Sequence, residues 1–287
     1  MGKDTPMHSP LQEIVALLGY PVAGNPTQYM VERALSRIGL DWRYLTLEVA
    51  PENLADAVRG MRAMGFRGGN FTMPHKVTVL PLLDELTEAA RLMGAVNCWW
   101  RHDDRLLGDN TDGKGFLQSL RGLVDPAGRR FAVLGAGGAA RAIAVELALA
   151  GAADILIVNR DAGRGEQLAS LISQQAHVPA RCVAWHGDFS LPADTEVLIN
   201  ATSIGMGDGQ ARMPVALDSL RPGLIVADVV INPPNTRLLR EAAQQGCQTL
   251  DGLGMLINQG AIGFKIWTGL DCDSAAMREA AEEFLGI

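Results

Sequence analysis

Residues 131 to 160 carry the feature that most constrains the fold of this chain. An apolar run, 131–134, meets Gly135-Ala136-Gly137-Gly138-Ala139-Ala140, then an Ala-, Leu- and Val-rich stretch, then a second apolar run, 155–158. This order is typical of strand, glycine turn, helix and strand. The dinucleotide-binding fingerprint needs a glycine for the turn, a glycine beside the pyrophosphate and a small residue where helix packs on strand. Gly135, Gly137 and Ala140 fill these places, so we predict a nucleotide whose phosphates lie at the helix N-terminus.

The residues after the second strand bear on the choice of nucleotide. An acidic residue there accepts from the ribose 2′-OH of NAD, and an arginine accommodates the 2′-phosphate of NADP. The chain offers Asn159, Arg160 and Asp161, and then Arg164, which is a mixed signal. We expect NAD as the cofactor, with NADP as the alternative. If no nucleotide bound here, these would be solvated loop charges.

Composition limits the classes of protein to consider. A chain of 287 residues with 48% hydrophobic residues is more consistent with two domains than with one. A net charge of −7 without a basic block argues against a nucleic-acid partner. The sequence has no apolar stretch of about 20 residues for a membrane span, and the start MGKDTPMHSP lacks a signal peptide's apolar segment. The four cysteines show no metal-ligand or disulfide spacing, so we expect free thiols, no metal and a cytoplasmic protein.

Strand and helix patterns alternate along the whole chain, which predicts an α/β fold. Before the fingerprint we expect strands at 13–18, 42–49 and 95–100, and helices at 51–64 and 80–93. A further helix there is marked by Met30, Ala34 and Ile38. After it we expect helices at 166–174, 236–245, 252–267 and 274–285, and strands at 195–200, 224–230 and 247–250.

Polar residues gather where these elements end. The loop 24–28 follows the first strand, and the segment 68–76 ends in His75-Lys76. Asp112 stands where the first domain hands over to the nucleotide domain, and clefts between domains are where small-molecule sites concentrate. From local pattern alone, Lys76 is a catalytic residue or a surface charge, His75 is a structural residue or a base, and Asp112 is a site residue or a helix cap.

Taken together, these motifs resemble those of the shikimate dehydrogenase family over nearly the whole chain. They are GGNFTMPHK at 68–76, AVN at 95–97, NTDGKGF at 110–116, GAGGAARAI at 135–143, NATSIGM at 200–206 and GLGMLINQG at 252–260. The resemblance implies an N-terminal α/β substrate domain, residues 1–112 plus 248–287, and an inserted Rossmann-type dinucleotide-binding domain, residues 113–247. It also implies hydride transfer between NAD(P) and a ring hydroxyl of shikimate, quinate or a related hydroxylated cyclohexane acid.

The resemblance also assigns site residues by position. Lys76 and Asp112 match the catalytic pair. The substrate-binding positions are Asn25, Thr27, Asn70, Thr72, Asn97 and Gln259. The cofactor-binding positions are Gly135, Gly137, Gly138, Ala139, Asn159, Arg160, Asp161, Arg164, Thr202, Ser203, Met206, Val230, Gly252 and Met255. In this mechanism Lys76 rests protonated beside the Asp112 carboxylate and donates to the nascent alkoxide during ketone reduction.

The chain departs from the family at the substrate carboxylate. Family members that use shikimate well commonly have Ser-x-Ser where this chain has Asn25 and Thr27, and often a tyrosine where it has Ile231. We therefore expect an altered substrate preference within the family, with a small hydroxy acid as the partner molecule. The alternatives are a dehydrogenase for another small hydroxy acid and a nucleotide-binding sensor of the same fold. We expect a monomer or a homodimer.

Overall fold

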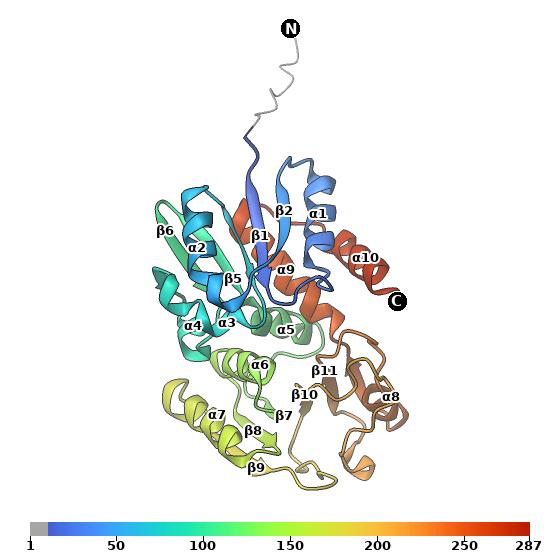
Figure 1. Ribbon diagram of the computed structural model, residues 1–287. Coiled ribbons are helices and arrows are strands. Elements are labelled where there is room, and N and C mark those ends of the chain that lie inside the picture. Colours follow the sequence, from blue (N-terminus) through green and yellow to red (C-terminus); the bar gives the residue numbers. More distant parts are fainter. Residues whose placement is uncertain (1–10) are drawn as a thin grey trace.

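The computed structural model describes residues 11–287 as two α/β domains, one above the other in Figure 1. Residues 1–10, the polar start MGKDTPMHSP used to argue against a signal peptide, lie outside the described residues. Within residues 11–287, no helix has the length and apolar character needed to cross a membrane. The fold class expected from the sequence is confirmed.

The first domain is built on a mixed sheet. From edge to edge its strands are β2 (Arg43–Glu48), β1 (Ile14–Gly19), β3 (Gly68–Phe71), β5 (Cys98–His102), β6 (Arg105–Asp109) and β4 (Glu85–Leu86). β1 is parallel to β2 and β3, whereas β5 is antiparallel to β3 and β6. The domain also contains α1 (Thr27–Ile38), α2 (Leu54–Ala63), α3 (His75–Thr78) and α4 (Glu88–Met93), with 3-10 turns at Pro51–Asn53 and Leu80–Leu82.

The end of the chain returns to this first domain. The last two helices are α9 (Leu253–Thr268) and α10 (Ser274–Leu285), and α10 lies beside α1 in Figure 1. Arg33 on α1 pairs with Glu283 on α10 at 2.9 Å, and the rings of Tyr29 and Phe284 lie 6.1 Å apart. The first domain is therefore built from residues at both ends of the described chain.

The second domain is a doubly wound parallel sheet. Its strands lie in the order β12 (Gln248–Leu250), β11 (Ile225–Asp228), β10 (Val197–Asn200), β7 (Arg130–Leu134), β8 (Asp154–Asn159) and β9 (Ala180–Ala184). Its helices are α6 (Gly138–Leu149), α7 (Ala162–Gln175) and α8 (Arg237–Gln244), with a 3-10 turn at Leu217–Ser219. The strand order reverses between β7 and β10, and such sheets bind ligands at the carboxyl ends of the strands at this point. The glycine fingerprint directly follows β7.

Helix α5 (Thr111–Arg121) joins the two domains and is packed tightly on both sides. A Cβ on Gly113 would lie 2.3 Å from the carbonyl oxygen of Ala142 on α6, and one on Gly115 would lie 2.6 Å from that of Met255 on α9. Only glycine allows α5 to come this close to both neighbours. Phe116 of α5 also belongs to the same buried apolar cluster as residues of β7 and α6, so the joint is part of the core.

One local expectation was wrong, and two local features were not foreseen. The helix expected over 80–93 is a 3-10 turn, the short strand β4 and then α4, because Thr87 caps α4 by accepting from the N–H of Ala90 at 3.2 Å. The helix marked by Met30, Ala34 and Ile38 is α1, but Ile38 is 38% exposed, because α1 ends there and Gly39 turns the chain with a φ of 72°. The strand β9 was missed because it is a largely exposed edge strand without an apolar run.

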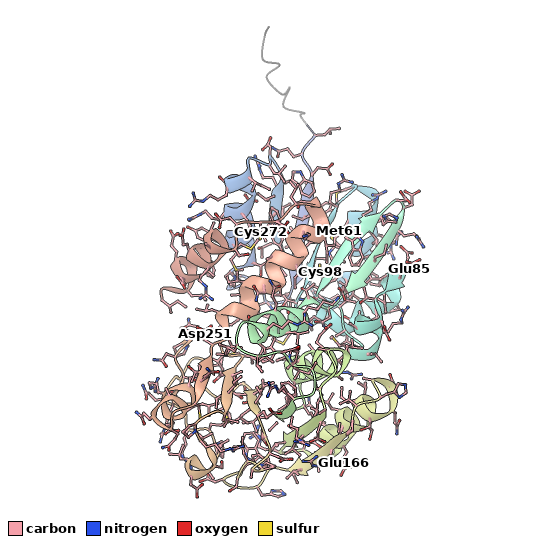
Figure 2. All side chains as sticks on the ribbon, turned by 180° about the vertical axis from the view of Figure 1, so that it is seen from behind. Met61, Glu85, Cys98, Glu166, Asp251 and Cys272 are labelled. Carbon is pink, nitrogen blue, oxygen red and sulfur yellow. The ribbon has the colours of Figure 1, made fainter. Side chains whose placement is uncertain are left out.

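The nucleotide sheet extends past the expected domain boundary at residue 247. β12 pairs in parallel with β11, which puts the return to the first domain after Leu250. Asp251 lies at this transition, between the two domains in Figure 2. The exact boundaries, 1–112 plus 248–287 and 113–247, stay a prediction.

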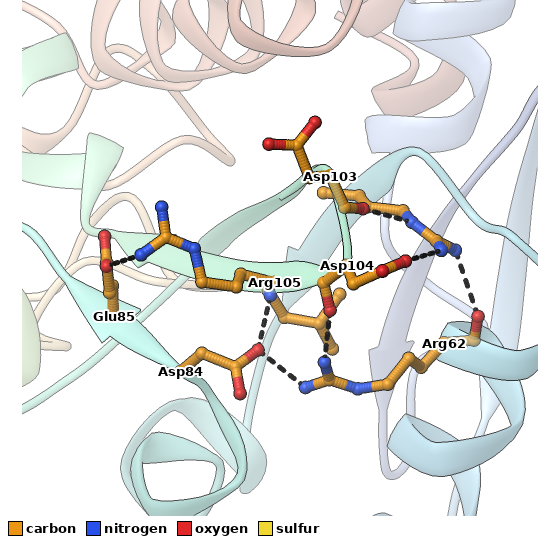
Figure 3. A network of polar contacts seen from close by, with 8 residues as sticks. Arg62, Asp84, Glu85, Asp103, Asp104 and Arg105 are labelled. Carbon is orange, nitrogen blue, oxygen red and sulfur yellow. Dashed lines mark hydrogen bonds and ion pairs between the residues drawn. The ribbon is translucent and has the colours of Figure 1, made fainter.

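A surface network holds the β5–β6 hairpin (Figure 3). Arg62 on α2 pairs with Asp84 at 2.7 Å and donates to the carbonyl oxygen of Asp104 at 2.6 Å. The backbone N–H of Leu106, with help from Arg62, holds the pKa of the Asp84 carboxyl below its usual value. Exposed pairs of this kind contribute about 0 to 1 kcal/mol each, but they fix the hairpin whose first strand follows Asn97.

Candidate active site

Lys76 and Asp112, expected as the catalytic pair, meet in the structure. Lys76 lies on α3 and Asp112 in the first turn of α5, and Lys76 Nζ donates to Asp112 Oδ2 at 2.6 Å. Their side chains are 31% and 21% exposed, so a substrate can reach them. The ammonium is held by a carboxylate and faces a partly open site, which suits proton donation to a developing alkoxide.

Asn97 holds the other oxygen of the Asp112 carboxylate. Its Nδ2 donates to Asp112 Oδ1 at 2.8 Å and to Thr111 Oγ1 at 3.1 Å, and its Oδ1 accepts from the Thr111 N–H at 2.6 Å. The sequence predicts Asn97 as a ligand of a substrate hydroxyl. In the structure both of its donors already have acceptors, so a substrate would have to share or replace one of these bonds.

Asn70, also expected at the substrate, lies behind Asn97. Its side chain is 5% exposed, its Nδ2 donates to the carbonyl oxygen of Asn97 at 2.9 Å, and its Oδ1 accepts from the hydroxyl of Tyr44 at 2.6 Å. Tyr44 is itself fully buried. This geometry makes Asn70 a support for Asn97. Sequence reasoning missed Tyr44 because the contact spans 26 residues and no local motif marks it.

The remaining expected substrate residues present free polar groups. Asn25 Oδ1 accepts from the N–H of Thr27 at 2.9 Å, which leaves its amide nitrogen free of any hydrogen bond within residues 11–287. The hydroxyls of Thr27 and Thr72 likewise make no hydrogen bond to a described residue. Gln259 on α9 donates to the carbonyl oxygen of Leu256 at 3.0 Å, and its Oε1 stays available. No hydrogen bond among described residues joins these four side chains to Lys76 or Asp112.

The glycine turn after β7 fits a pyrophosphate. Gly135 has a φ of 107°, which only glycine adopts readily, and a Cβ there would lie 3.0 Å from the carbonyl oxygen of Ala201. Gly137 and Gly138 stand at the start of α6, where a Cβ on either would meet nothing within 4 Å. The space in front of the helix is therefore open. The backbone N–H groups there, including that of Ala139, have no side-chain cap and are available to a phosphate.

The residues after β8 are held in part by one another. Asn159 Nδ2 donates to the carbonyl oxygen of Asp161 at 2.7 Å. Asp161 caps α7, because its Oδ1 accepts from the N–H of Arg164 at 3.1 Å. Arg160 and Arg164 are exposed, and neither guanidinium forms an ion pair with another described residue. Two exposed cations and one partly used carboxylate therefore lie after β8, where the adenosine ribose is expected.

The residues expected at the nicotinamide follow β10 and β11 and begin α9. The N–H and Oγ1 of Thr202 donate to Asn200 Oδ1 at 3.0 and 2.7 Å. Ser203 accepts from the N–H of Met206, whose side chain is 63% exposed. The side chain of Val230 is fully buried, so only its backbone can reach a cofactor.

Gly252, at the start of α9, packs closely against the backbone of Val230. A Cβ there would lie 2.5 Å from the carbonyl oxygen of Val230, so a larger residue would push the helix away. Met255, one turn further along α9, packs partly buried against the core of the nucleotide domain. The beginning of α9 is thus fixed against the loop after β11.

Two charged residues at the domain joint were also missed. Arg141 on α6 donates to the carbonyl oxygen of Leu92 on α4 at 3.1 Å, its Nε is buried without a partner among the described residues, and burial lowers its pKa. Glu146, one turn further along α6, is 6% exposed, and its Oε1 also lacks a partner there. A charged residue within the apolar pattern of 139–149 was the only available signal.

Family comparisons agree with this geometry over most of the chain. Residues 17–99 match the shikimate dehydrogenase substrate binding domain, residues 120–203 match shikimate / quinate 5-dehydrogenase, and residues 252–282 match the shikimate 5'-dehydrogenase C-terminal domain. A shikimate dehydrogenase (NADP(+)) from Methanopyrus kandleri is 42% identical over 277 residues, 95% of this chain and 96% of that protein. The chain belongs to the shikimate dehydrogenase family.

Two solved structures of relatives bear on the chemistry. The ligand-free 5-ketofructose reductase of Gluconobacter sp. strain CHM43 is 53% identical, with a TM-score of 0.94 and coverage of 96% of this chain and 99% of the other. Shikimate 5-dehydrogenase of Listeria monocytogenes, in complex with shikimate and NAD, is 36% identical, with a TM-score of 0.88 and coverage of 94% and 96%. The protein is accordingly an NAD(P)-dependent oxidoreductase of the shikimate dehydrogenase family, which is favoured over the nucleotide-binding sensor.

Proposed function

We propose that this enzyme uses NADPH to reduce a neutral, polyhydroxylated ketone of the kind named for its 5-ketofructose reductase relative. The observation that carries the proposal is the substrate loop, where Asn25 and Thr27 replace the serine pair expected to hold a carboxylate. A carboxylate only accepts hydrogen bonds, whereas a substrate hydroxyl both donates and accepts, as an amide does. Ile231, in the place of a tyrosine, removes a further donor, and a hydrogen bond to a charged group is worth about 1.5 to 3 kcal/mol.

The identities support this substrate over a cyclohexane acid. The chain is 53% identical to the ketofructose reductase and 36% to the shikimate-bound Listeria enzyme. Lys76, Asn97, Asp112 and Gln259, the positions expected at the reacting hydroxyl, are nevertheless the residues expected for shikimate dehydrogenases. Shikimate and quinate are therefore the proper comparison substrates.

The roles of the chain's own residues follow from the geometry. Lys76 donates a proton to the carbonyl oxygen as that oxygen becomes an alcohol. Asp112, 2.6 Å from Lys76 Nζ, holds the ammonium in place, and Asn97 fixes the carboxylate. When bound, the nicotinamide cofactor supplies the hydride. The N–H groups at the start of α6 would hold its pyrophosphate.

We infer NADP as the cofactor in place of the NAD first expected. One carboxylate oxygen of Asp161 caps α7, which leaves Asp161 less able to accept a hydrogen bond from a ribose hydroxyl. Arg160 and Arg164 are exposed and form no ion pair with the described residues, so they can bind a 2′-phosphate. Curated relatives at 42% and 41% identity carry the name shikimate dehydrogenase (NADP(+)).

The test is a matrix of initial rates with 5-ketofructose, 3-dehydroshikimate and 3-dehydroquinate, each with NADPH and with NADH. We expect kcat/KM for 5-ketofructose to exceed those for the two acids by more than tenfold, with Lys76→Ala as the blank. The double variant Asn25→Ser/Thr27→Ser should shift this ratio toward the acids. A larger kcat/KM for 3-dehydroshikimate in the native enzyme would refute the proposed substrate.

The cofactor is tested separately on the same enzyme. Arg160→Ala/Arg164→Ala should raise the KM for NADPH by more than tenfold and leave the KM for NADH within about twofold, since each charged contact is worth about 1.5 to 3 kcal/mol. Equal effects on both cofactors would contradict an NADP site at these residues. The native enzyme's preference for NADH over NADPH would do the same.

The proposal also covers the cellular location and the oligomeric state of the enzyme. The four cysteines, Cys98, Cys182, Cys247 and Cys272, are free thiols, as expected for a cytoplasmic enzyme. A monomer or homodimer stays the prediction for the assembly. Light scattering of the purified protein distinguishes these from a larger oligomer.

A further inference from the structure

Asp228 is a buried carboxylate that neither the motifs nor the proposed chemistry uses. It is the last residue of β11, and it is 1% exposed. Both of its oxygens accept hydrogen bonds: Oδ1 from Asn200 Nδ2 at 2.9 Å and from the N–H of Val230 at 3.0 Å, and Oδ2 from Thr236 Oγ1 at 2.7 Å. Three donors point at it from three separate segments.

The first of these segments is the loop after β10. Asn200, whose Nδ2 donates to Asp228, accepts from the N–H and hydroxyl of Thr202 through its Oδ1. The same Nδ2 donates to the carbonyl oxygen of Ile204 at 3.2 Å. The orientation of this one amide therefore sets the path of residues 200–204. Asp228 fixes the orientation, because only the NH₂ side of the amide can face a carboxylate.

The second segment leads to the start of α9. The Asp228 side chain accepts a hydrogen bond from the backbone N–H of Val230. Gly252 packs against the same backbone, so closely that a Cβ added to Gly252 would lie 2.5 Å from the carbonyl oxygen of Val230. A shift of Val230 would therefore move the beginning of the helix that carries Met255. The third segment is α8, whose cap Thr236 accepts from the N–H of Leu239 and donates to Asp228.

We propose that Asp228 is a positioning residue for the nicotinamide half of the cofactor. It fixes the loop 200–204, the Val230 backbone and, through Gly252, the start of α9, without touching the cofactor itself. The adenosine half lies at the end of β8 and depends on none of these contacts. The proposal rests on the proposed placement of the cofactor along the carboxyl edge of the second sheet.

The experiment separates the two halves of the cofactor by binding. Thr236→Val removes one donor to Asp228 at nearly constant volume, and Thr236→Ser keeps it. Dissociation constants for NADPH and for 2′,5′-ADP, which lacks the nicotinamide half, are measured by fluorescence and calorimetric titration. We expect Thr236→Val to weaken NADPH about tenfold and 2′,5′-ADP less than twofold, with Thr236→Ser restoring native values. Asp228→Asn, which turns an NH₂ group toward donors, should show a larger effect of the same kind.

The outcomes are distinct. Equal weakening of NADPH and 2′,5′-ADP would mean a general structural role for Asp228, and unchanged NADPH binding in both Thr236→Val and Asp228→Asn would mean no role in positioning. Either result overturns the proposal. If the native protein fails to bind 2′,5′-ADP, the NADP assignment fails by itself. The same comparison is then made with NADH and ADP-ribose, where selective weakening of NADH still supports positioning by Asp228.

Discussion

Glu146→Gln should stabilise the protein in a pH-dependent way. Glu146 lies on α6 in the joint with α5, and its Oε1 is buried without a hydrogen-bond partner among the described residues. Burial raises the pKa of Glu146 to about 7, although Lys114 and Arg121 lower the pKa in part, and Asp109 adds to the rise. A buried carboxylate without hydrogen bonds destabilises the folded state once it is ionised.

The sign and size of this stability change follow from the pKa of Glu146 in the folded and unfolded states. The ordinary pKa is 4.5 and the folded-state pKa is about 7, so the folded protein holds this proton more tightly than the unfolded chain. The penalty is absent below pH 4, grows as the pH rises from about 4.5 to 7, and is constant above that. At about 1.4 kcal/mol per pH unit, the difference corresponds to at most about 3 kcal/mol. We expect about 2 kcal/mol, because the 6% of Glu146 that is exposed lets water screen part of the penalty.

The assay is urea unfolding at pH 4.5 and at pH 8.5 for the native protein and Glu146→Gln. The gain in unfolding free energy from the substitution should be about 2 kcal/mol larger at pH 8.5 than at pH 4.5. Using the difference between the two pH values removes any constant cost of burying the amide. Glu166→Gln, on the exposed side of α7 (Figure 2), is the control and should give the same value at both pH values. A gain that is equal at both pH values, or larger at pH 4.5, would refute the reasoning.

Three further predictions follow from single contacts. Lys76→Ala should lower turnover by about 10² to 10⁴ while leaving NADPH binding within twofold; native turnover in this variant would exclude Lys76 as the proton donor. Thr87→Ala should cost about 1 to 2 kcal/mol of unfolding free energy, since it removes the cap on Ala90 and a hydrogen bond to Asp109, and Thr87→Ser should recover most of that loss. Gly113→Ala should lower the unfolding free energy by about 1 to 3 kcal/mol or more, because the new methyl would meet α6; an unchanged value would mean that the joint is loose.

Much of the fold was predictable because the local sequence pattern favours the same elements that the packing of the domains needs. The strand, glycine turn and helix at 131–149 form where expected, since Gly135 needs its positive φ and the helix needs small residues against the sheet. The division of residues 80–93 into a 3-10 turn, β4 and α4 was not predictable from their apolar residues. Residues 85–86 pair with β6, and that partner arrives in the sequence only after Arg105.

The candidate site also has a part that the sequence predicts and a part that only the structure shows. The sequence by itself determined that a nucleotide domain follows a small α/β domain, and it supplied Lys76 and Asp112 as candidates, because residue types at fixed spacings carry that information. Only the tertiary structure decided that Asn70 lies behind Asn97, that Asp161 caps a helix, and that Asp228 and Glu146 are buried. These properties depend on hydrogen bonds and burial between segments far apart in the chain. A side chain's environment is set by what the fold brings against it, which no local pattern contains.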